Sequence, residues 1–83
     1  MYTRFFGYNA EKYLHQKGNE LHKKIKGCFS MFAFNKDTNT IYIYTTHPGM
    51  WIGRAGIDIA KIKEDLQKMF PYPIDVAIVE TTI

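Results

Sequence analysis

The stretch that decides the fold is His47–Leu66, which reads HPGMWIGRAGIDIAKIKEDL. Two glycines, Gly53 and Gly56, bracket Arg54 and Ala55 between a very short helical pattern and a longer one. Glycine permits backbone torsions and close approaches that a side chain would block. A helix that begins after Gly56 presents unpaired amide donors and the positive end of its dipole to any nearby anion.

Arg54 adds to this bend a positive charge that is not lost near neutral pH. Together with the amide donors, the guanidinium can hold a sugar-phosphate backbone, with most contacts made through the protein amides. The alternative is a solvated arginine in a tight turn between two helices. We favour the phosphate role because glycines bracket the arginine.

The chain downstream of the bend predicts a helix and then a strand. Apolar residues recur at helical spacing at Ile59, Ile62, Leu66 and Met69 or Phe70, and Pro71 and Pro73 end the helix. Residues 74–79 alternate large apolar with small or polar side chains, which is typical of a strand. The outer face of the helix is expected to carry Lys61, Lys63, Glu64, Asp65, Gln67 and Lys68.

The chain upstream of the bend predicts a helix and a hairpin. A helical period begins at Asn9, the expected N-cap, and is expected to stop at Gly27. Residues 28–34 and 40–46 are rich in aromatic and β-branched side chains, and a cluster of turn-forming residues separates them. We therefore predict an antiparallel hairpin, with Met1–Gly7 as a short arm or edge.

The predicted fold is α+β in a single domain, residues 1–83, with the motif core at residues 46–80. Three helices cover one face of a three-stranded mixed sheet, in the chain order αββααβ. The helices between the second and third strands predict a right-handed crossover, which makes those strands parallel neighbours. The strand order is then 1-2-3, with strand 2 central. The side chains expected to face the helices from strands 2 and 3 are Ile41, Ile43, Val76 and Ile78.

The composition excludes several classes of protein. A chain of 83 residues and 9.7 kDa has room for one small domain, and 46% apolar with 23% charged residues is a globular balance. The single cysteine, Cys28, excludes an internal disulfide framework and a thiolate-rich zinc site, and it favours a reducing, cytoplasmic setting. No apolar run approaches the roughly 20 residues that cross a bilayer, and the N-terminus lacks a secretory signal, so no membrane is expected.

The charges permit an anionic partner and indicate no catalytic or metal site. The net charge is +3, and residues 1–26 hold six basic but only two acidic residues. Residues 71–83 hold only acidic charges, Asp75 and Glu80. His15 and His22 have no cysteine or carboxylate that completes a zinc pattern. No nucleophile–base pairing stands out, so we expect a protein that is not an enzyme and that needs no metal or cofactor.

The sequence around the bend resembles the KH domain. Ile52-Gly53-Arg54-Ala55-Gly56, followed by Ile59, is similar to the I-G-x-x-G-x-x-I core of that family. The element order resembles the type II arrangement, because the extra helix and strand precede the motif. Residues 48–54 resemble in particular the KH domain of a small-subunit ribosomal protein. The topological resemblance covers nearly the whole chain.

The resemblance implies a groove for about four nucleotides of single-stranded RNA or DNA, with RNA favoured. The loop of residues 53–56 would clamp the backbone, the paired helices over 50–62 would form one wall, and the third strand with its preceding loop would form the other. Trp51 is larger than the usual family residue and is expected in the core. Ile57 stands where the family often has a polar or acidic residue. The implied binding residues are Gly53, Arg54, Ala55, Gly56, Met50, Ile52, Ile57, Tyr72, Ile74 and Val76.

The open face of the predicted sheet supports a different function. Alternation along the second strand places Tyr42 and Tyr44 away from the helices, and Phe32 and Phe34 of the first strand are expected to join them. Such a face is more apolar than a soluble monomer normally exposes. The alternative is therefore a KH-shaped protein–protein module, such as a viral or mobile-element factor, that forms a homodimer or docks on a host protein. A third interpretation is that bases of a nucleic acid stack on Tyr42 and Tyr44.

Overall fold

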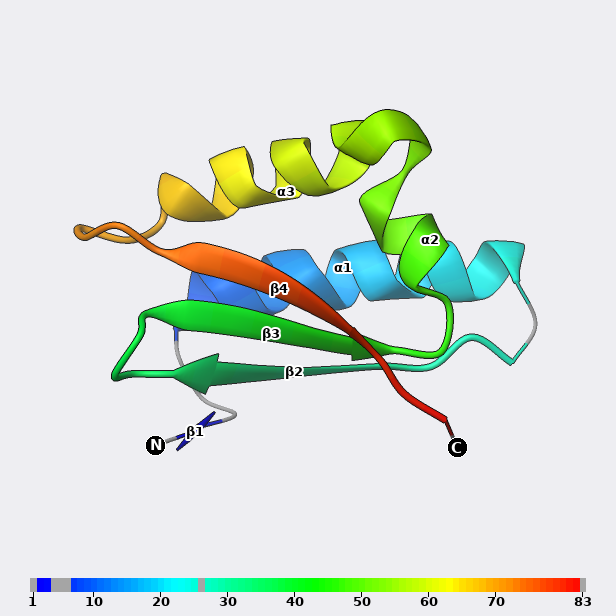
Figure 1. Ribbon diagram of the computed structural model, residues 1–83, viewed down its shortest axis with the longest axis horizontal. Coiled ribbons are helices and arrows are strands. Elements are labelled where there is room, and N and C mark those ends of the chain that lie inside the picture. The colour runs from blue at the N-terminus through cyan, green and yellow to red at the C-terminus, as the bar shows by residue number, and fades with distance from the viewer. Residues whose placement is uncertain (1, 4–6, 26, 83) are drawn as a thin grey trace.

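The computed structural model describes residues 2–3, 7–25 and 27–82, and it shows a mixed α+β fold (Figure 1). The prediction of an α+β domain is confirmed. In the view of Figure 1, α1 passes behind β3 and β4, and α3 runs above β4. The elements are β1 (Tyr2–Thr3), α1 (Tyr8–Lys24), β2 (Ser30–Asn35), β3 (Thr40–Thr45), α2 (Pro48–Ile52), the 3₁₀ turn η1 (Arg54–Gly56), α3 (Ile57–Gln67) and β4 (Asp75–Glu80).

The sheet has the strand order β1-β2-β3-β4. β2 pairs antiparallel with β3, and β3 pairs parallel with β4, so the mixed pairing around the central strand is as predicted. α2, η1 and α3 form the crossover that parallel neighbours require. The sheet has four strands where three were predicted, because Tyr2–Thr3 pairs with the edge of β2. β1 was not predicted, because a two-residue strand is too short to show an alternating pattern. Residues 1 and 4–6 of the predicted N-terminal arm lie outside the described residues.

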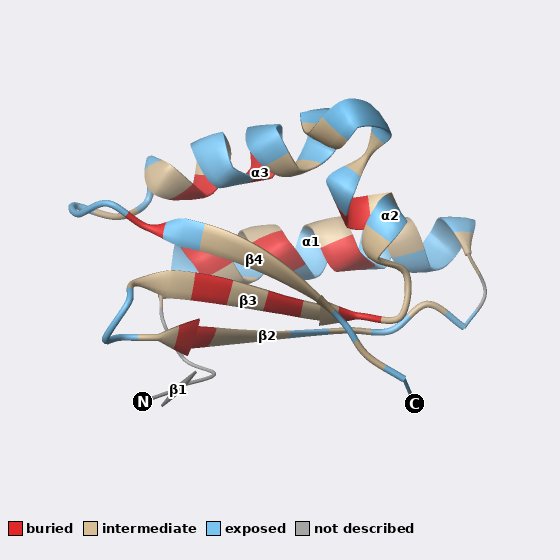
Figure 2. Cartoon of the chain, in the orientation of Figure 1, coloured by how far each residue is buried: buried red, intermediate tan, exposed pale blue. Residues whose placement is uncertain are grey.

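The core lies between the helices and the sheet (Figure 2). Leu14 of α1, Ile41 and Ile43 of β3 and Leu66 of α3 are all fully buried there. Trp51 is also 0% exposed, as its predicted core position requires, although it belongs to the five-residue helix α2. Burial of these large side chains anchors the short helix beside the bend, because apolar area removed from water is the main stabilising contribution in so small a domain.

Helix α1 begins and ends earlier than predicted. Its N-cap is Gly7 rather than Asn9, because the Glu11 carboxylate accepts a hydrogen bond of 3.2 Å from the Gly7 amide and so closes the first turn. Its last helical residue is Lys24, and Gly27 lies beyond the end. Within α1, the buried Gly18 faces the core, where a β-carbon would lie 3.7 Å from the Phe32 ring and 3.9 Å from the Trp51 ring. These are ordinary contact distances, so an alanine would fit at this position.

The strand register corrects the predicted open face. Phe34 pairs directly with Ile41 and Phe32 with Ile43, and directly opposed residues point to the same side of a sheet. Both phenylalanines therefore face the helices, where Phe34 is only 4% exposed. The prediction that they share a face with the β3 tyrosines is wrong, because the pattern of a single strand leaves open which of its two faces meets the core. The neighbours of the tyrosines are Met31 and Ala33 of β2 and Ala77 and Val79 of β4.

Candidate nucleic-acid interface

The bend of residues 53–56 has an unusual backbone. Gly53, Ala55 and Gly56 all have positive φ angles, of 75°, 55° and 75°. Gly53 combines its φ with a ψ of 178°, a region that only glycine adopts readily. Ala55 is a non-glycine residue in the left-handed region, which costs about 1–2 kcal/mol. The packing of the flanking helices must therefore hold the bend in shape.

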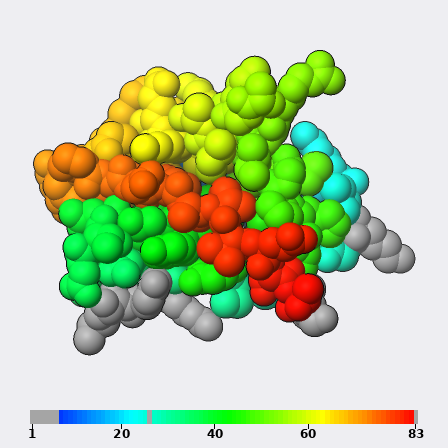
Figure 3. Space-filling view, viewed as in Figure 1, coloured from blue at the N-terminus to red at the C-terminus, as the bar shows by residue number. Residues whose placement is uncertain are grey.

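The bend stands on the surface. Arg54 and Ala55 are exposed, and Ile57, the first residue after Gly56, is 65% exposed. In Figure 3 the light-green segment between α2 and α3 protrudes from the molecule. No described side chain caps the first turn of α3, and the Gly56 and Ile57 amides donate to the backbone carbonyls of Gly53 and Arg54. Arg54 forms no ion pair with any described residue. The bend thus presents an exposed cation beside the positive end of the α3 dipole.

One flank of α3 faces α1. The Tyr13 hydroxyl donates a hydrogen bond of 2.8 Å to Asp65, and Lys61 lies 3.3 Å from the same carboxylate. The bond from Tyr13, followed by the charge of Lys61, holds the pKa of Asp65 below its usual range. Burial, together with the bond to Asp65, raises the pKa of Tyr13 above its ordinary value. Asp65 was predicted on a solvated outer face and instead joins two helices.

The other flank of α3 faces β4 and its preceding loop. Lys63 forms an ion pair of 3.1 Å with Asp75 at the start of β4. The Gln67 side chain donates to the Tyr72 carbonyl and accepts from the Ile74 amide, each at 2.9 Å. Lys63 and Gln67 therefore connect α3 to β4 and its preceding loop. The prediction of a solvated outer face did not include these contacts.

The predicted wall residues fall into two groups. Ile52 and Ile57, 37% and 65% exposed, stand on either side of the bend. Met50, on α2, turns toward α1 and lines a pocket there. Tyr72, which is 39% exposed, lies at the opposite end of α3, about 16 Å along the helix axis. The structure therefore brings the bend together with residues 50, 52 and 57, and it holds the α3–β4 loop apart from them.

The strand side of the predicted groove is mostly buried. Ile74 is 6% exposed and belongs to the core, and Val76 packs against that core while keeping partial exposure. Of these two side chains, only Val76 retains surface that a ligand could touch. Alternation along β4 explains this, because residues 76 and 78 face the helices.

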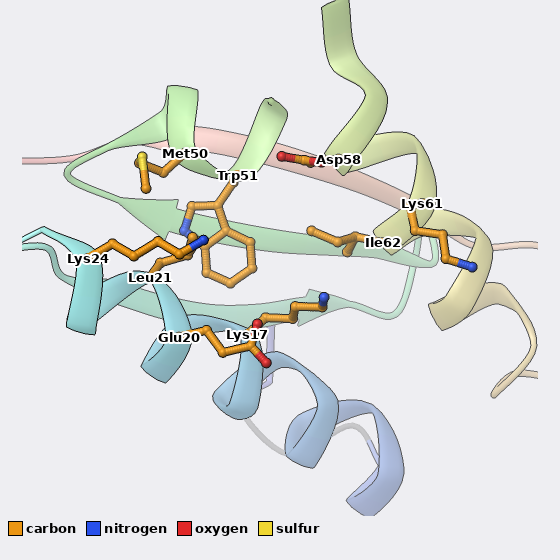
Figure 4. A pocket seen from close by; sticks show the side chains of 9 residues that line it. All are labelled: Lys17, Glu20, Leu21, Lys24, Met50, Trp51, Asp58, Lys61 and Ile62. Atoms are coloured by element: carbon orange, nitrogen blue, oxygen red, sulfur yellow. The ribbon is translucent and has the colours of Figure 1, made fainter. Parts of the chain in front are cut away.

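Sequence reasoning missed a pocket behind the bend, between α1 and the α2–α3 pair (Figure 4). Lys17, Leu21 and Lys24 of α1 line it, and Asp58 and Lys61 of α3 stand opposite. The spacing of residues 17, 21 and 24 places them on one face of a helix, which was a usable signal. The same spacing does not predict that this face of α1 meets α2 and α3.

Two negative findings hold for the described part of the chain. No helix there is long and apolar enough to span a membrane. No group of three or more histidine, cysteine or acidic side chains is placed to bind a metal ion among those residues.

A comparison with protein families places this site in context. The family model described as KH domain matches residues 18–82, from within α1 to two residues beyond β4. The chain therefore belongs to the KH domain family, and the resemblance stated from the motif is confirmed. KH domains are in general nucleic-acid-binding modules rather than enzymes. No curated protein matches the chain.

Proposed function

We propose that this KH domain binds single-stranded nucleic acid, with RNA favoured, and that the GxxG loop Gly53–Gly56 clamps the backbone of about four nucleotides. The observation that carries the proposal is the exposed bend, in which the Arg54 guanidinium stands in solvent beside the start of α3. The helix and hairpin that precede the bend support the type II arrangement.

The bend suits a phosphodiester for three physical reasons. A glycine at each end lets the nucleic-acid backbone approach the protein backbone closely. The amides and dipole at the start of α3 favour negative charge. The guanidinium of Arg54 carries a positive charge and donors that match phosphate, and it is free to move onto one. Together they hold the strand without reading its sequence, since phosphate contacts position the strand and base contacts specify it.

The apolar residues beside the loop would receive the bases. Ile52 and Ile57 expose large apolar surfaces next to the bend, and Val76 adds a partly exposed one from β4. Met50, which turns toward α1, and Ile74, which is buried in the core, would make little direct contact with the bases. Tyr72, at the far end of α3, would meet the last base of an extended strand.

Reversal of charge in the loop tests the proposal. The variant Arg54→Asp with Ala55→Asp should retain the fold, because aspartate tolerates the left-handed region better than most residues. Its affinity for a pool of single-stranded RNA should fall at least tenfold in fluorescence anisotropy, through repulsion of phosphate. A matched control is Lys36→Asp with Thr38→Asp in the exposed β2–β3 turn, which changes the net charge equally. Equal binding by the parent and the loop variant would contradict the proposal, and single-stranded DNA in the same titration tests the preference for RNA.

The open sheet face favours a second candidate function, a protein–protein interaction. Tyr42 and Tyr44 stack with ring centres 6.2 Å apart, and Met31 on the same face is 39% exposed. No described helix packs on this face. A homodimer, or a complex with a host protein, would cover the apolar surface and remove it from water.

A further inference from the structure

A pocket of about 220 Å³ lies on the side of α2 and α3 that faces α1 (Figure 4). Its floor is apolar and is formed by Leu21, Trp51 and Ile62 from three different helices. The volume lies below the about 300–1,000 Å³ of pockets for drug-sized ligands. The pocket therefore suits a single ring system.

The rim of this pocket is charged. Three lysines, Lys17, Lys24 and Lys61, stand against two carboxylates, Glu20 and Asp58. Three cations and two anions leave one net positive charge, which matches the single negative charge of one phosphodiester. A polyphosphate would meet too much like charge at this rim.

The three lysines of the rim differ in whether they form an ion pair. Lys61 is engaged with Asp65 at 3.3 Å, and the Lys17 ammonium lies 5.8 Å from the Tyr13 ring centre. Among the described residues, Lys17 and Lys24 take part in no ion pair. These two side chains of α1 are therefore available to a ligand.

The pocket and the loop share a wall. The Asp58 carboxylate that lines the pocket also packs against Gly53 of the loop. α2, which supplies Met50 and Trp51 to the pocket, leads directly into the loop. A strand held at residues 53–56 therefore passes the mouth of the pocket if it continues toward α1.

We propose that this pocket receives the nucleotide next to the stretch that the loop clamps. The base lies over the apolar floor, and its phosphate lies against Lys17 and Lys24. The indole Nε1 of Trp51 has no hydrogen-bond partner among the described residues, and Trp51 is 0% exposed, so the indole lies beneath the surface that the base would cover. The inference rests on the proposed binding of a single strand.

Oligonucleotides of two lengths test the pocket. The parent should bind an eight-nucleotide RNA more tightly than a four-nucleotide RNA, because only the longer strand reaches both sites. The variant Lys17→Glu with Lys24→Glu should lose at least tenfold in affinity for the longer RNA. The matched control is Lys12→Glu with Lys23→Glu, which makes the same charge change at two positions of α1 outside the pocket.

The single tryptophan of the chain lies in the pocket floor and provides a second readout. Its emission should change more with the longer RNA than with the shorter one, and the Lys17→Glu, Lys24→Glu variant should abolish that difference. Circular dichroism of each variant checks the fold. If the pocket variant and the Lys12→Glu, Lys23→Glu control lose the same affinity for the longer RNA, the pocket assignment is overturned while loop binding stands. If the parent binds neither RNA, both the proposed function and the proposed role of the pocket are contradicted.

Discussion

The carboxylate of Asp58 occupies the space that a β-carbon on Gly53 would need. Gly53 also has a φ of 75° with a ψ of 178°, which side chains rarely allow. Gly56 differs, because its left-handed torsions are open to other residues at a cost. A β-carbon on Gly56 would lie 4.0 Å from its nearest neighbour, a side-chain atom of Ile59. The two glycines of the loop are therefore required for different reasons.

The first prediction compares the two glycines. Gly53→Ala should lower the free energy of unfolding by about 3 kcal/mol, because torsional strain and the collision with Asp58 add together. Gly56→Ala should lower it by about 1 kcal/mol, through torsional strain alone. Urea unfolding measures both. Adding Asp58→Ala to Gly53→Ala should restore part of the loss, and equal losses for the two glycine variants would show that the contact with Asp58 has no effect.

The second prediction concerns the bond between α1 and α3. Tyr13→Phe removes the hydrogen bond to Asp65 and keeps the ring, so the free energy of unfolding should fall by about 1 kcal/mol. The pKa of Asp65, followed by NMR, should rise toward its usual value, because the bond from Tyr13 is the main cause of its lowering. Tyr8→Phe is the control, since Tyr8 is 73% exposed. An unchanged pKa of Asp65 would contradict the assignment.

The third prediction concerns Gln67. Gln67→Ala leaves the Ile74 amide without its acceptor, so stability should fall by about 1–3 kcal/mol and exchange of that amide should accelerate. Gln67→Glu keeps the acceptor but sets a carboxylate beside the Tyr72 carbonyl. That variant should gain stability relative to the parent as the pH falls and the glutamate becomes protonated. A pH-independent difference would mean that the loop does not depend on the amide donor.

The fourth prediction concerns acid. The ion pair with Lys63, and then the Val76 amide, hold the pKa of Asp75 below its usual range. A carboxyl whose pKa is lower in the folded state stabilises the fold above the unfolded pKa, near 4. That stability is lost as the pH falls through the folded pKa. The loss should stay below about 1 kcal/mol, because both side chains are largely exposed.

Lys63→Met should raise the pKa of Asp75 and flatten the dependence of stability on pH below 5, as measured by urea unfolding between pH 6 and pH 2.5. Lys68→Met is the control, since Lys68 lies 3.8 Å from Glu64 and does not contact Asp75. The same pH profile in both variants would exclude a contribution from the ion pair between α3 and β4.

The fifth prediction tests the open sheet face. If that face forms a homodimer, the parent should scatter light as a dimer and the Tyr42→Ser, Tyr44→Ser variant as a monomer, because the change removes the largest apolar surface there. The control Tyr8→Ser with Tyr72→Ser removes two exposed rings from other surfaces. A parent that stays monomeric, with partner binding unaffected by the change, would exclude this face as an interface.

Much of the local structure was predictable because its signals are local. The period from Ile59 to Leu66 predicted α3, and the glycines at 53 and 56 predicted the bend. Which face of each strand and helix is buried was harder to predict. Phe32 was assigned to the wrong side of the sheet. A six-residue strand with apolar residues on both faces does not show which of its two faces is buried. Asp65 has the charge of a solvated residue, yet α1 lies against it.

The amino-acid sequence alone determined which segments become the longer helices and strands, where the chain bends, and which family the motif indicates. These properties depend on spacing and torsional preference within about 20 residues. Only the tertiary structure decided which side of β2 is buried, which helix flanks meet, and that Lys17 and Lys61 border one pocket. Such contacts join residues far apart in the chain, and close packing of the whole core selects them.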